Sequence, residues 1–547
     1  MSLKMPKAPG PPLFKEGYRV QQGVDDVVVR NIHAICELSD ILRTSYGPNG
    51  RNKIVVNHLM KMMVSSDAAT ILQELDVVHP AAKILVMASK QQDTEMGDAT
   101  NFVLIFAGEL LKNAETLIKM GLHPSEISQG YEMARDYALK TLETGLSVDR
   151  VQNVSSADEL YRAIKSSIAA KQFGHEKILG NFVAEAALMV LPKNPLNFNV
   201  DNIRVVKILG GSLFESMVVK GMVFPREPEG TVRKVSSAKV GVFSCPLDIS
   251  QTETKGIVLL RNSKEMLDFS KGEEVQLESM VKELSDSGIR VVVTNGGVGD
   301  LVLHYLNKYN LLVIKVLSKF DLQRLCRVIG ATPLARLGAP MPEEMGYVDV
   351  VETVEIGGDR VTIFRQANEA TRTATIVLRG AAQNYLDDIE RAIDDGVNLV
   401  KAIIKDPRLV AGAGATEIEL SKQLSSYAEE VSGVFQHSIK KYAEAFEVIP
   451  RTLAENAGLD STEVLGKLYA LHHSENKQTA GVNVEGNGDT IIDAKEAGIF
   501  DVLSVKLWAC KLASEAALTI LRVDQIIMSK PAGGPKPPGP NKDWDNE

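Results

Sequence analysis

The 547-residue sequence lacks several features that would mark particular protein classes. No uninterrupted apolar run is long enough to span a bilayer, so an integral membrane protein is not expected. There is no basic block and the net charge is −9, which argues against nucleic acid as a partner. The N-terminus, MSLKMPKAPGPPLFKEG, is rich in proline and has no apolar core of a signal peptide. We therefore expect a cytoplasmic protein with neither membrane nor nucleic-acid partners.

Cysteine and histidine are also too sparse to suggest a metal centre. The four cysteines are far apart in the sequence: Cys36, Cys245, Cys326 and Cys510. No Cys-x-x-Cys metal or redox motif exists, and buried free thiols in a reducing compartment are expected instead. His472 and His473 are adjacent, but neighbouring helical side chains point apart and few ligand-type residues surround them. We do not expect a zinc site there.

The sequence does contain two kinds of patterning. Its length suggests about three or four domains. Residues from about 24 to 147 and from about 410 to 528 show helical periodicity, as in the segment that follows the start signal HPSE at 123–126. Between about 216 and 367, short β-branched runs such as SGIRVVVTNGG alternate with helical stretches, which is typical of an α/β domain. The pattern predicts an α/β unit inserted into a helical unit, with hinge segments at about 148–215 and 368–409.

A Gly-Asp step opens the apolar run TEMGDATNFVLIFAGELL at 94–111. If Asp98 is the N-cap of a helix, the amides of the next residues face outward at the positive helix end, where an anion binds well. An aspartate beside a phosphate also suits Mg²⁺. The alternative is that Asp98 only caps the helix.

Similar steps recur along the chain, and each alone fits an ordinary turn or helix cap. They are TSYGPNGRNK at 44–53, SSDAATIL at 65–72, LVAGAGATEIEL at 409–420 and EAGIFD at 496–501. Glycines in such loops let backbone amides approach a phosphate closely. We expect the last stretch to end a helix at Gly498.

Taken in order, these stretches resemble the group II chaperonins, the ATP-driven folding cages of the eukaryotic cytosol and archaea. The motifs TSYGPNGRNKIVVNH, DAATILQELDVVHPAAKILV, GDATN, GAGATEIEL and LRVDQIIM keep the order and spacing of that family. Finer motifs, among them CPLDISQTETKG and GATPLARLGAP, are similar to one subunit type of the eukaryotic cytosolic complex. The resemblance covers residues from about 14 to 540.

The resemblance implies the multidomain chaperonin fold. A mostly α equatorial domain with a small sheet would comprise residues 1–147 and 410–547. An intermediate α/β hinge domain would comprise 148–215 and 368–409. The inserted α/β apical domain, 216–367, would carry a helical protrusion at about 247–275 that acts as a built-in lid. Its helices near 300–308 and 318–329 would contact clients, although most of their side chains could equally serve the core.

The family also implies an activity and partners. Such a chain would be an ATPase that binds ATP or ADP with Mg²⁺. It would assemble with seven paralogous subunits into a hetero-oligomeric double ring. That ring would enclose unfolded client proteins of the actin and tubulin class.

The resemblance assigns residues to the nucleotide site. Asp98 corresponds to the Mg²⁺ ligand and Asp395 to the water-activating carboxylate, with Asp67 assisting. The remaining nucleotide contacts correspond to Ser45, Tyr46, Gly47, Pro48, Ala99, Thr100, Asn101, Phe102, Ala169, Ala170, Lys171, Gly412, Gly414, Asp501 and Lys506. From the residues alone, the pair Asp394-Asp395 would be expected on a solvated helix face.

Several positions depart from the family pattern. Three family glycines are alanine here, at 68, 99 and 413, and Asp394 and Ala170 replace a histidine and a serine. At a positive φ, Ala99 would cost roughly 1–2 kcal/mol. As the first residue of a helix, it would cost nothing. We therefore predict slow hydrolysis with nucleotide binding retained.

Two other functions stay open at this stage. One is a hydrolytically idle structural subunit that keeps its nucleotide. The other is a dinucleotide or sugar-phosphate enzyme built on the α/β middle, active as a monomer. The loop GGVGD at 296–300 suggests the latter, but it lacks the third glycine at the right offset.

Overall fold

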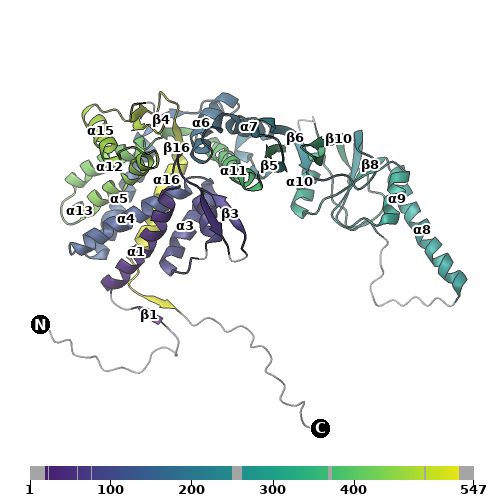
Figure 1. The fold of residues 1–547 in the computed structure, drawn as a ribbon, viewed down its shortest axis with the longest axis horizontal. Helices are drawn as coiled ribbons and strands as arrows, with labels where there is room; N and C mark the ends of the chain where they lie inside the picture. The colour runs from purple at the N-terminus through teal and green to yellow at the C-terminus, as the bar shows by residue number, and fades with distance from the viewer. Residues whose placement is uncertain are drawn as a thin grey trace, which may run out of the picture.

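The computed structural model describes residues 19–21, 24–57, 60–75, 77–248, 262–366, 373–485 and 488–528. It is elongated, with a helical bundle at one end, an α/β sheet region toward the other, and helices α6, α7 and α11 between them (Figure 1). The expectation of a mixed α/β multidomain chain is confirmed.

The helical bundle combines the first and last parts of the chain around one apolar core. The run after residue 101 makes α4 apolar on nearly all sides, so this helix lies at the centre of the core. Within the core, the ring of Phe106 stacks on Phe446 at 4.4 Å between centroids. The bundle contains α1 (Val24–Arg43), α2 (Ala68–Glu74), α3 (Pro80–Met96), α4 (Thr100–Lys119), α5 (Pro124–Gly145), α12 (Ala415–Glu430), α13 (Phe435–Ala445), α14 (Val448–Asn456), α15 (Ser461–Ser474) and α16 (Leu503–Leu521).

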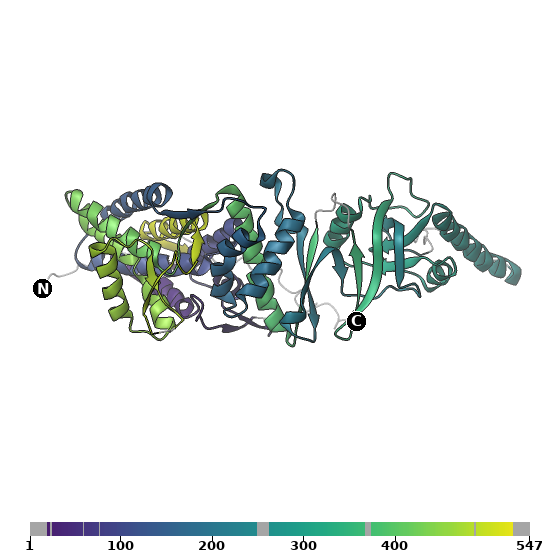
Figure 2. The same ribbon diagram turned by 90° about the horizontal axis from the view of Figure 1, so that it is seen from above.

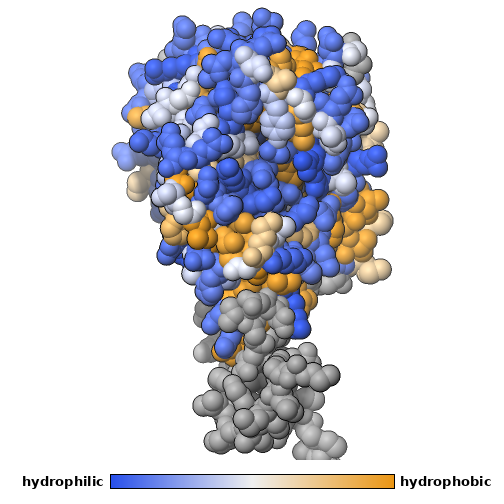
Figure 3. Space-filling model, turned by 90° about the vertical axis from the view of Figure 1, so that its left-hand side faces the viewer, coloured by the Kyte–Doolittle hydropathy of each residue, from blue (hydrophilic) through white to orange (hydrophobic). Residues whose placement is uncertain are grey.

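Four small sheets accompany the helices at this end of the molecule. The surface of this end is mostly hydrophilic, with scattered apolar patches (Figure 3). A three-stranded sheet in the order β16-β13-β4 joins its two halves. The strands are β1 (Arg19–Gln21) with β17 (Ile526–Met528), β2 (Lys53–Val56) with β3 (Met62–Ser65), β14 (Ala480–Val482) with β15 (Ile491–Asp493), and β4 (Ser147–Arg150), β13 (Arg408–Ala411) and β16 (Phe500–Val502).

The middle of the molecule has its own core, formed by three helices and two parallel strands. The helices are α6 (Ala157–Lys171), α7 (Glu176–Val190) and α11 (Gln383–Lys405), and the strands are β5 (Ile203–Leu209) and β12 (Ala374–Gly380). Short 3₁₀ turns, η1 (Pro195–Asn197), η2 (Val200–Asn202) and η3 (Leu213–Glu215), connect them. Because α6 and α11 also contact the bundle, this region links the two ends of the molecule.

An eight-stranded sheet in the order β5-β12-β6-β11-β10-β7-β8-β9 extends from this middle region into the α/β end. The remaining strands are β6 (Met217–Phe224), β7 (Lys234–Phe243), β8 (Ile289–Thr294), β9 (Leu312–Lys315), β10 (Gly346–Ile356) and β11 (Asp359–Arg365), with helices α8 (Ser263–Asp286), α9 (Asp300–Lys308) and α10 (Lys319–Ile329). Helix α8 projects beyond the sheet (Figure 2). The predicted arm at 247–275 lies partly outside the described residues, at 249–261.

Local signals in the sequence mostly predict the right helix ends. The stretch HPSE starts α5 as expected, because His123 and Glu126 form a reciprocal capping box and Pro124 occupies the first turn. The expectation at Gly498 is wrong: the chain turns there with a φ of 69°, but residues 494–498 form a turn rather than the end of a helix. In the described parts of the chain, no helix is both long and apolar enough to cross a membrane.

Candidate functional site

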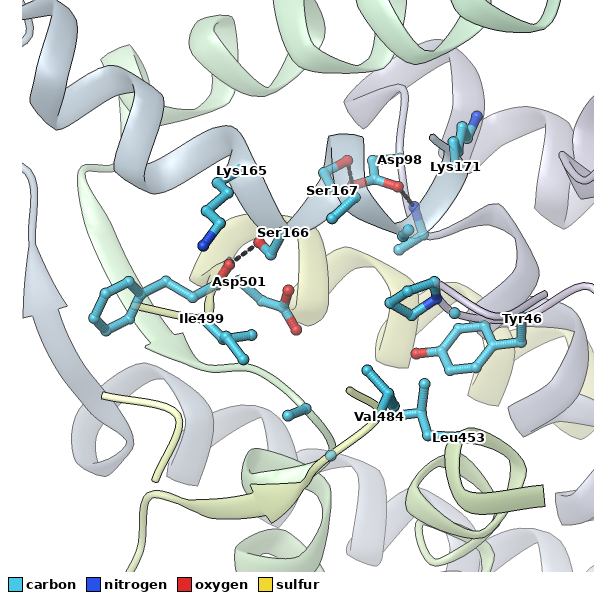
Figure 4. Close-up of a pocket in the computed structure, with 18 of the residues that line it drawn as sticks. Tyr46, Asp98, Lys165, Ser166, Ser167, Lys171, Leu453, Val484, Ile499 and Asp501 are labelled. Atoms are coloured by element: carbon cyan, nitrogen blue, oxygen red, sulfur yellow. Dashed lines mark hydrogen bonds between the residues drawn. The ribbon is translucent and has the colours of Figure 1, made fainter. Parts of the chain in front are cut away.

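A cleft opens between the helical bundle and α6, with a volume of about 1580 Å³ counted out to its mouth. Segments that are hundreds of residues apart form its walls (Figure 4). Tyr46 and Leu453 lie on one side, Asp501 enters from β16, and α6 covers the top. Ligand sites commonly form in such clefts between two parts of a molecule.

One wall of the cleft is the start of α4. The N-cap is Ala99, with a φ of 63°, so the expectation that Asp98 caps this helix is wrong. Asp98 therefore lies one residue before the cap. Its Oδ1 accepts a hydrogen bond of 2.6 Å from the Ala99 amide, and the residue lines the cleft. Asn101 ties neighbouring loops to this wall by donating to the carbonyls of Ser45 and Ser66.

Two loops on the cleft wall hold alanine at positive φ. Ala99 is one, and Ala413, with a φ of 56°, is the other. Each adjoins a glycine turn with positive φ, at Gly97 and Gly414, and such turns make concave arrays of amides that suit anions. Ala68 differs, because it is the first residue of α2 and carries no such strain. The first of the two alternatives for Ala99 therefore holds, at roughly 1–2 kcal/mol.

Lys171, at the end of α6, is held between two buried carboxylates. Its Nζ lies 3.3 Å from Asp67 Oδ1 and also pairs with Asp395 Oδ2. Asp67 caps α2 and accepts hydrogen bonds from Thr70 and, at 2.9 Å, from the Thr100 hydroxyl. The three donors to Asp67 therefore come from three helices: Lys171 from α6 in the middle region, and Thr70 and Thr100 from α2 and α4 in the bundle.

The pKa values of this cluster follow from burial and charge. Burial opposes ionisation of Asp67, but Lys171 and the bonds from Thr70 and Thr100 hold the pKa of Asp67 below its usual range. Burial raises the pKa of Asp395 well above its usual range. Burial also disfavours a charged Lys171, yet the two carboxylates hold its pKa above the usual range. Lys171 is therefore a fixed cation.

A second lysine between two carboxylates lies at the other end of the cleft, and this one is buried. Lys506 on α16 pairs with Glu417 of α12, and its Nζ lies 3.1 Å from Asp501 Oδ2. The same ammonium sits 5.0 Å from the centre of the Phe102 ring. Burial opposes the charge on Lys506, but Glu417 and Asp501 raise its pKa well above the usual range. Burial also raises the pKa of Asp501.

Comparison with known proteins agrees with this geometry. The TCP-1/cpn60 chaperonin family matches residues 38–531. The chain belongs to this family. It is 64% identical to a probable T-complex protein 1 subunit theta of Schizosaccharomyces pombe, and 54% and 51% identical to the T-complex protein 1 subunits theta of Saccharomyces cerevisiae and Homo sapiens. Each alignment covers the whole of both chains.

As a member of the TCP-1/cpn60 chaperonin family, the chain is an ATP-dependent chaperonin subunit and an ATPase that assists protein folding. The prediction from the motifs, including the subunit type, is confirmed. The dinucleotide-enzyme alternative is set aside. The loop at 296–300 packs tightly against the residues that follow β7, since a Cβ on Gly296 would lie 2.3 Å from the Cα of Pro246.

Most residues that the chaperonin resemblance assigned do line the cleft. These are Tyr46, Gly47, Pro48, Asp98, Ala99, Thr100, Asn101, Phe102, Ala169, Ala170, Lys171, Gly414, Asp501 and Lys506. Asp67 and Asp395 lie behind Lys171 rather than on the cleft wall, and both are 6% exposed. The expectation of a solvated face holds for Asp394, which is exposed, and is wrong for Asp395.

Two assigned residues lie behind the cleft wall, and a third is almost fully buried in it. Ser45 is buried, and its hydroxyl donates to the Arg51 carbonyl at 2.8 Å. Gly412 faces Ile499, where an added Cβ would approach to 2.9 Å. Phe102 lines the cleft but is only 1% exposed. These side chains shape the wall.

Two serines on α6 and a carboxylate on α12 were not predicted from the sequence. Ser167 donates a hydrogen bond of 2.5 Å to Asp98 Oδ2, and Ser166 donates to the Phe500 carbonyl. Glu417 pairs with Lys506. The spacing of Ser167 and Lys171, one helical turn apart, would have placed both on the face of α6 that covers the cleft.

The donors present fit a metal that arrives with the nucleotide. Among the described residues, no group of three His, Cys, Asp or Glu side chains could hold a metal alone. Asp98 supplies one carboxylate at the cleft wall, and Mg²⁺ commonly takes one or two carboxylates plus phosphate and water oxygens. His472 is committed elsewhere, because its ring nitrogens bond Glu419 at 3.1 Å and the Ala480 carbonyl at 2.9 Å.

Proposed function

We propose that the cleft binds ATP with Mg²⁺ and that its hydrolysis moves the middle of the molecule against the helical bundle. The observation that carries this proposal is the placement of Lys171. Its ammonium comes from α6 and contacts carboxylates of both the bundle and α11 beside Asp98. A γ-phosphate that draws Lys171 toward itself would change the contacts between these elements.

The cleft residues divide into phosphate-end and base-end roles. When bound, Mg²⁺ neutralises charge on the β- and γ-phosphates. Asp98 would hold the metal, and the amides beside Ala99 and Gly414 would hold phosphate oxygens. At the other end, Asp501, fixed by Lys506, would accept hydrogen bonds from the nucleoside.

Asp395 would act on the attacking water. Its raised pKa makes it a stronger base than an exposed aspartate once it is ionised. While Lys171 pairs with it, Asp395 is occupied. Movement of Lys171 onto a phosphate would leave this carboxylate free to accept a proton from water, with Asp67 as the second carboxylate of the site.

We also propose the division into equatorial, intermediate and apical domains at the boundaries given above, and closure of the predicted arm at about 247–275 as a lid. The chain would work in the cytosol with seven paralogous subunits in a double ring. Two exposed apolar surfaces support such contacts. The β2–β3 hairpin exposes Ile54 (70%) and Met62 (64%), which suits a neighbouring subunit, and α10 exposes Phe320 (73%), which suits unfolded clients of the actin and tubulin class.

Hydrolysis in this subunit would be slow. The strain at Ala99 and Ala413 lies in the two loops that would hold phosphate. Strain there makes it harder for the amides to reach their productive positions. An extreme form of the same effect is a subunit that keeps its nucleotide and does not hydrolyse it.

Photolabelling of the assembled complex tests these proposals for this one subunit. 8-Azido-ATP carrying ³²P at the α-phosphate reports occupancy, and the same probe labelled at the γ-phosphate reports uncleaved nucleotide, after the subunits are separated on a gel. We expect strong α-label, and γ-label that decays slowly. No α-label would contradict nucleotide binding, and undiminished γ-label would identify an idle subunit. Asp98→Asn should raise the Mg²⁺ concentration needed for labelling. Chemical crosslinking of the same complex should join this chain to several different subunits.

A further inference from the structure

We propose that Ser167 is a positioning residue that makes Mg²⁺ binding at Asp98 depend on the docking of α6. This inference rests on the proposed function, because it takes Asp98 as the metal ligand. Ser167 lies on the α6 segment of the middle region, whereas Asp98 belongs to the bundle. Their hydrogen bond therefore joins two parts of the molecule at the phosphate end of the cleft (Figure 4).

The carboxylate of Asp98 is oriented from both of its oxygens. Oδ1 accepts from the Ala99 amide at 2.6 Å, and Oδ2 accepts from the Ser167 hydroxyl at 2.5 Å. The backbone is fixed as well, because Gln92, fully buried, donates to the Asp98 carbonyl at 2.9 Å. An ionised carboxylate offers about four acceptor positions. Two of them are used here, so one on each oxygen stays available to a metal.

Ser167 is itself held in place. It is 9% exposed, and α6 is anchored on either side of it. One residue earlier, Ser166 donates to the backbone carbonyl of Phe500 on β16. One turn later, Lys171 pairs with Asp67 and Asp395. When α6 is docked in this way, the Ser167 hydroxyl donates to the Asp98 carboxylate.

Hydrogen bonds to a ligating carboxylate fix its orientation, and their loss typically lowers metal affinity 10–100-fold. If α6 moves away, Asp98 loses its bond from Ser167 and can rotate. The serine thus couples the position of the middle region to the affinity of the metal site. Lys171 responds to phosphate on the same helix face, whereas Ser167 acts on the metal ligand.

The test is the Mg²⁺ dependence of labelling by α-³²P 8-azido-ATP in the assembled complex. Ser167→Ala should raise the Mg²⁺ concentration for half-maximal labelling of this subunit by about tenfold. Ser167→Thr and Ser167→Val form a matched pair of the same shape, of which only threonine keeps a hydroxyl. Threonine should retain the parent midpoint and valine should share the alanine shift. This pair also serves if the alanine variant does not assemble.

Two controls make the outcomes decisive. Ser156→Ala removes a hydroxyl at the N-cap of α6 that makes no capping hydrogen bond and does not line the cleft, so it should leave the Mg²⁺ midpoint in place. An unchanged midpoint in both Ser167→Ala and Ser167→Val, or an equal shift in Ser156→Ala, overturns the inference. If Asp98→Asn shifts the midpoint while the Ser167 variants do not, only this inference fails. If Asp98→Asn also titrates like the parent, the metal assignment in the proposed function fails with it.

Discussion

The two ends of the cleft use the same chemistry in different mechanical settings. At each end a lysine lies between two carboxylates: Lys171 between Asp67 and Asp395, and Lys506 between Glu417 and Asp501. The partners of Lys506 come from α12 and β16, and all three residues belong to the helical-bundle end. The partners of Lys171 come from α2 in the bundle and from α11 in the middle region.

This difference separates a structural cluster from one that can transmit motion. A buried ion pair within one packed body has a single arrangement, so it fixes geometry. An ion pair that spans two parts of the molecule contributes a free energy that is lost when the parts separate. A ligand that competes for the lysine can therefore shift the equilibrium between the docked and separated arrangements. Ion-pair chemistry alone does not distinguish the two clusters; the elements that carry the residues do.

The largest expected effect is on stability, from Lys506→Met. Glu417 is 1% exposed, and the substitution leaves it and Asp501 without their cation. Removal of one partner from a buried ion pair typically costs about 3–5 kcal/mol. Chemical unfolding of the purified chain, monitored by circular dichroism, measures the change. Adding Glu417→Gln to Lys506→Met should recover part of the loss.

Lys171→Met provides the comparison. Asp67 keeps its hydrogen bonds from Thr70 and Thr100, and Asp395, with its raised pKa, can take up a proton, so the loss should be smaller. Equal losses for the two lysines would remove the distinction between the two ends of the cleft.

The next effect is on hydrolysis, from Asp395→Ala. Loss of a positioned general base commonly lowers a rate by about 10²–10⁴-fold. The γ-label should therefore persist on this subunit, while α-label shows that nucleotide is still bound. Asp394→Ala is a matched control, because Asp394 is the adjacent residue of α11 and its side chain is exposed. A comparable loss of hydrolysis in both variants would argue against a specific role for Asp395.

Alanine-to-glycine substitutions should have smaller effects, with signs set by the backbone. Ala99 and Ala413 have φ of 63° and 56°, so glycine relieves roughly 1–2 kcal/mol of strain, partly offset by its greater freedom in the unfolded chain. Ala68 starts α2, where glycine should cost about 0.5–1 kcal/mol. Unfolding free energies of the three variants measure this, and faster decay of γ-label in the first two would link the strain to slow hydrolysis. A uniform sign across all three would show that backbone geometry does not decide the outcome.

How far the sequence predicts this site depends on the range of the interactions. Local signals place the start of α5 and the turn at Gly47, because a cap or turn depends on residues close in sequence. The left-handed conformation of Ala99 could not be derived, since alanine disfavours it and the packed loop imposes it. The burial of Asp395 was missed for a similar reason: a charged helix position is usually exposed, and Lys171, more than two hundred residues away, is what stabilises it.

The smallest effect is the acid sensitivity that Lys171 confers through Asp67. In the folded chain the pKa of Asp67 lies below its unfolded value of about 3.9, so its stabilisation is complete above that pH and is lost as the pH falls through the folded pKa. The pKa of Lys171 is raised, so its stabilisation is lost only as the pH rises through that value, above about 10.4. The unfolding free energies of the parent and Lys171→Met should therefore differ most between about pH 5 and 10, and the difference should shrink progressively as the pH falls below about 4. A difference that stays constant down to pH 3 would mean that Lys171 stabilises the fold only by packing of its aliphatic stem. The Lys171 cluster would then lack the electrostatic contribution that is expected to respond to movement between the middle region and the bundle.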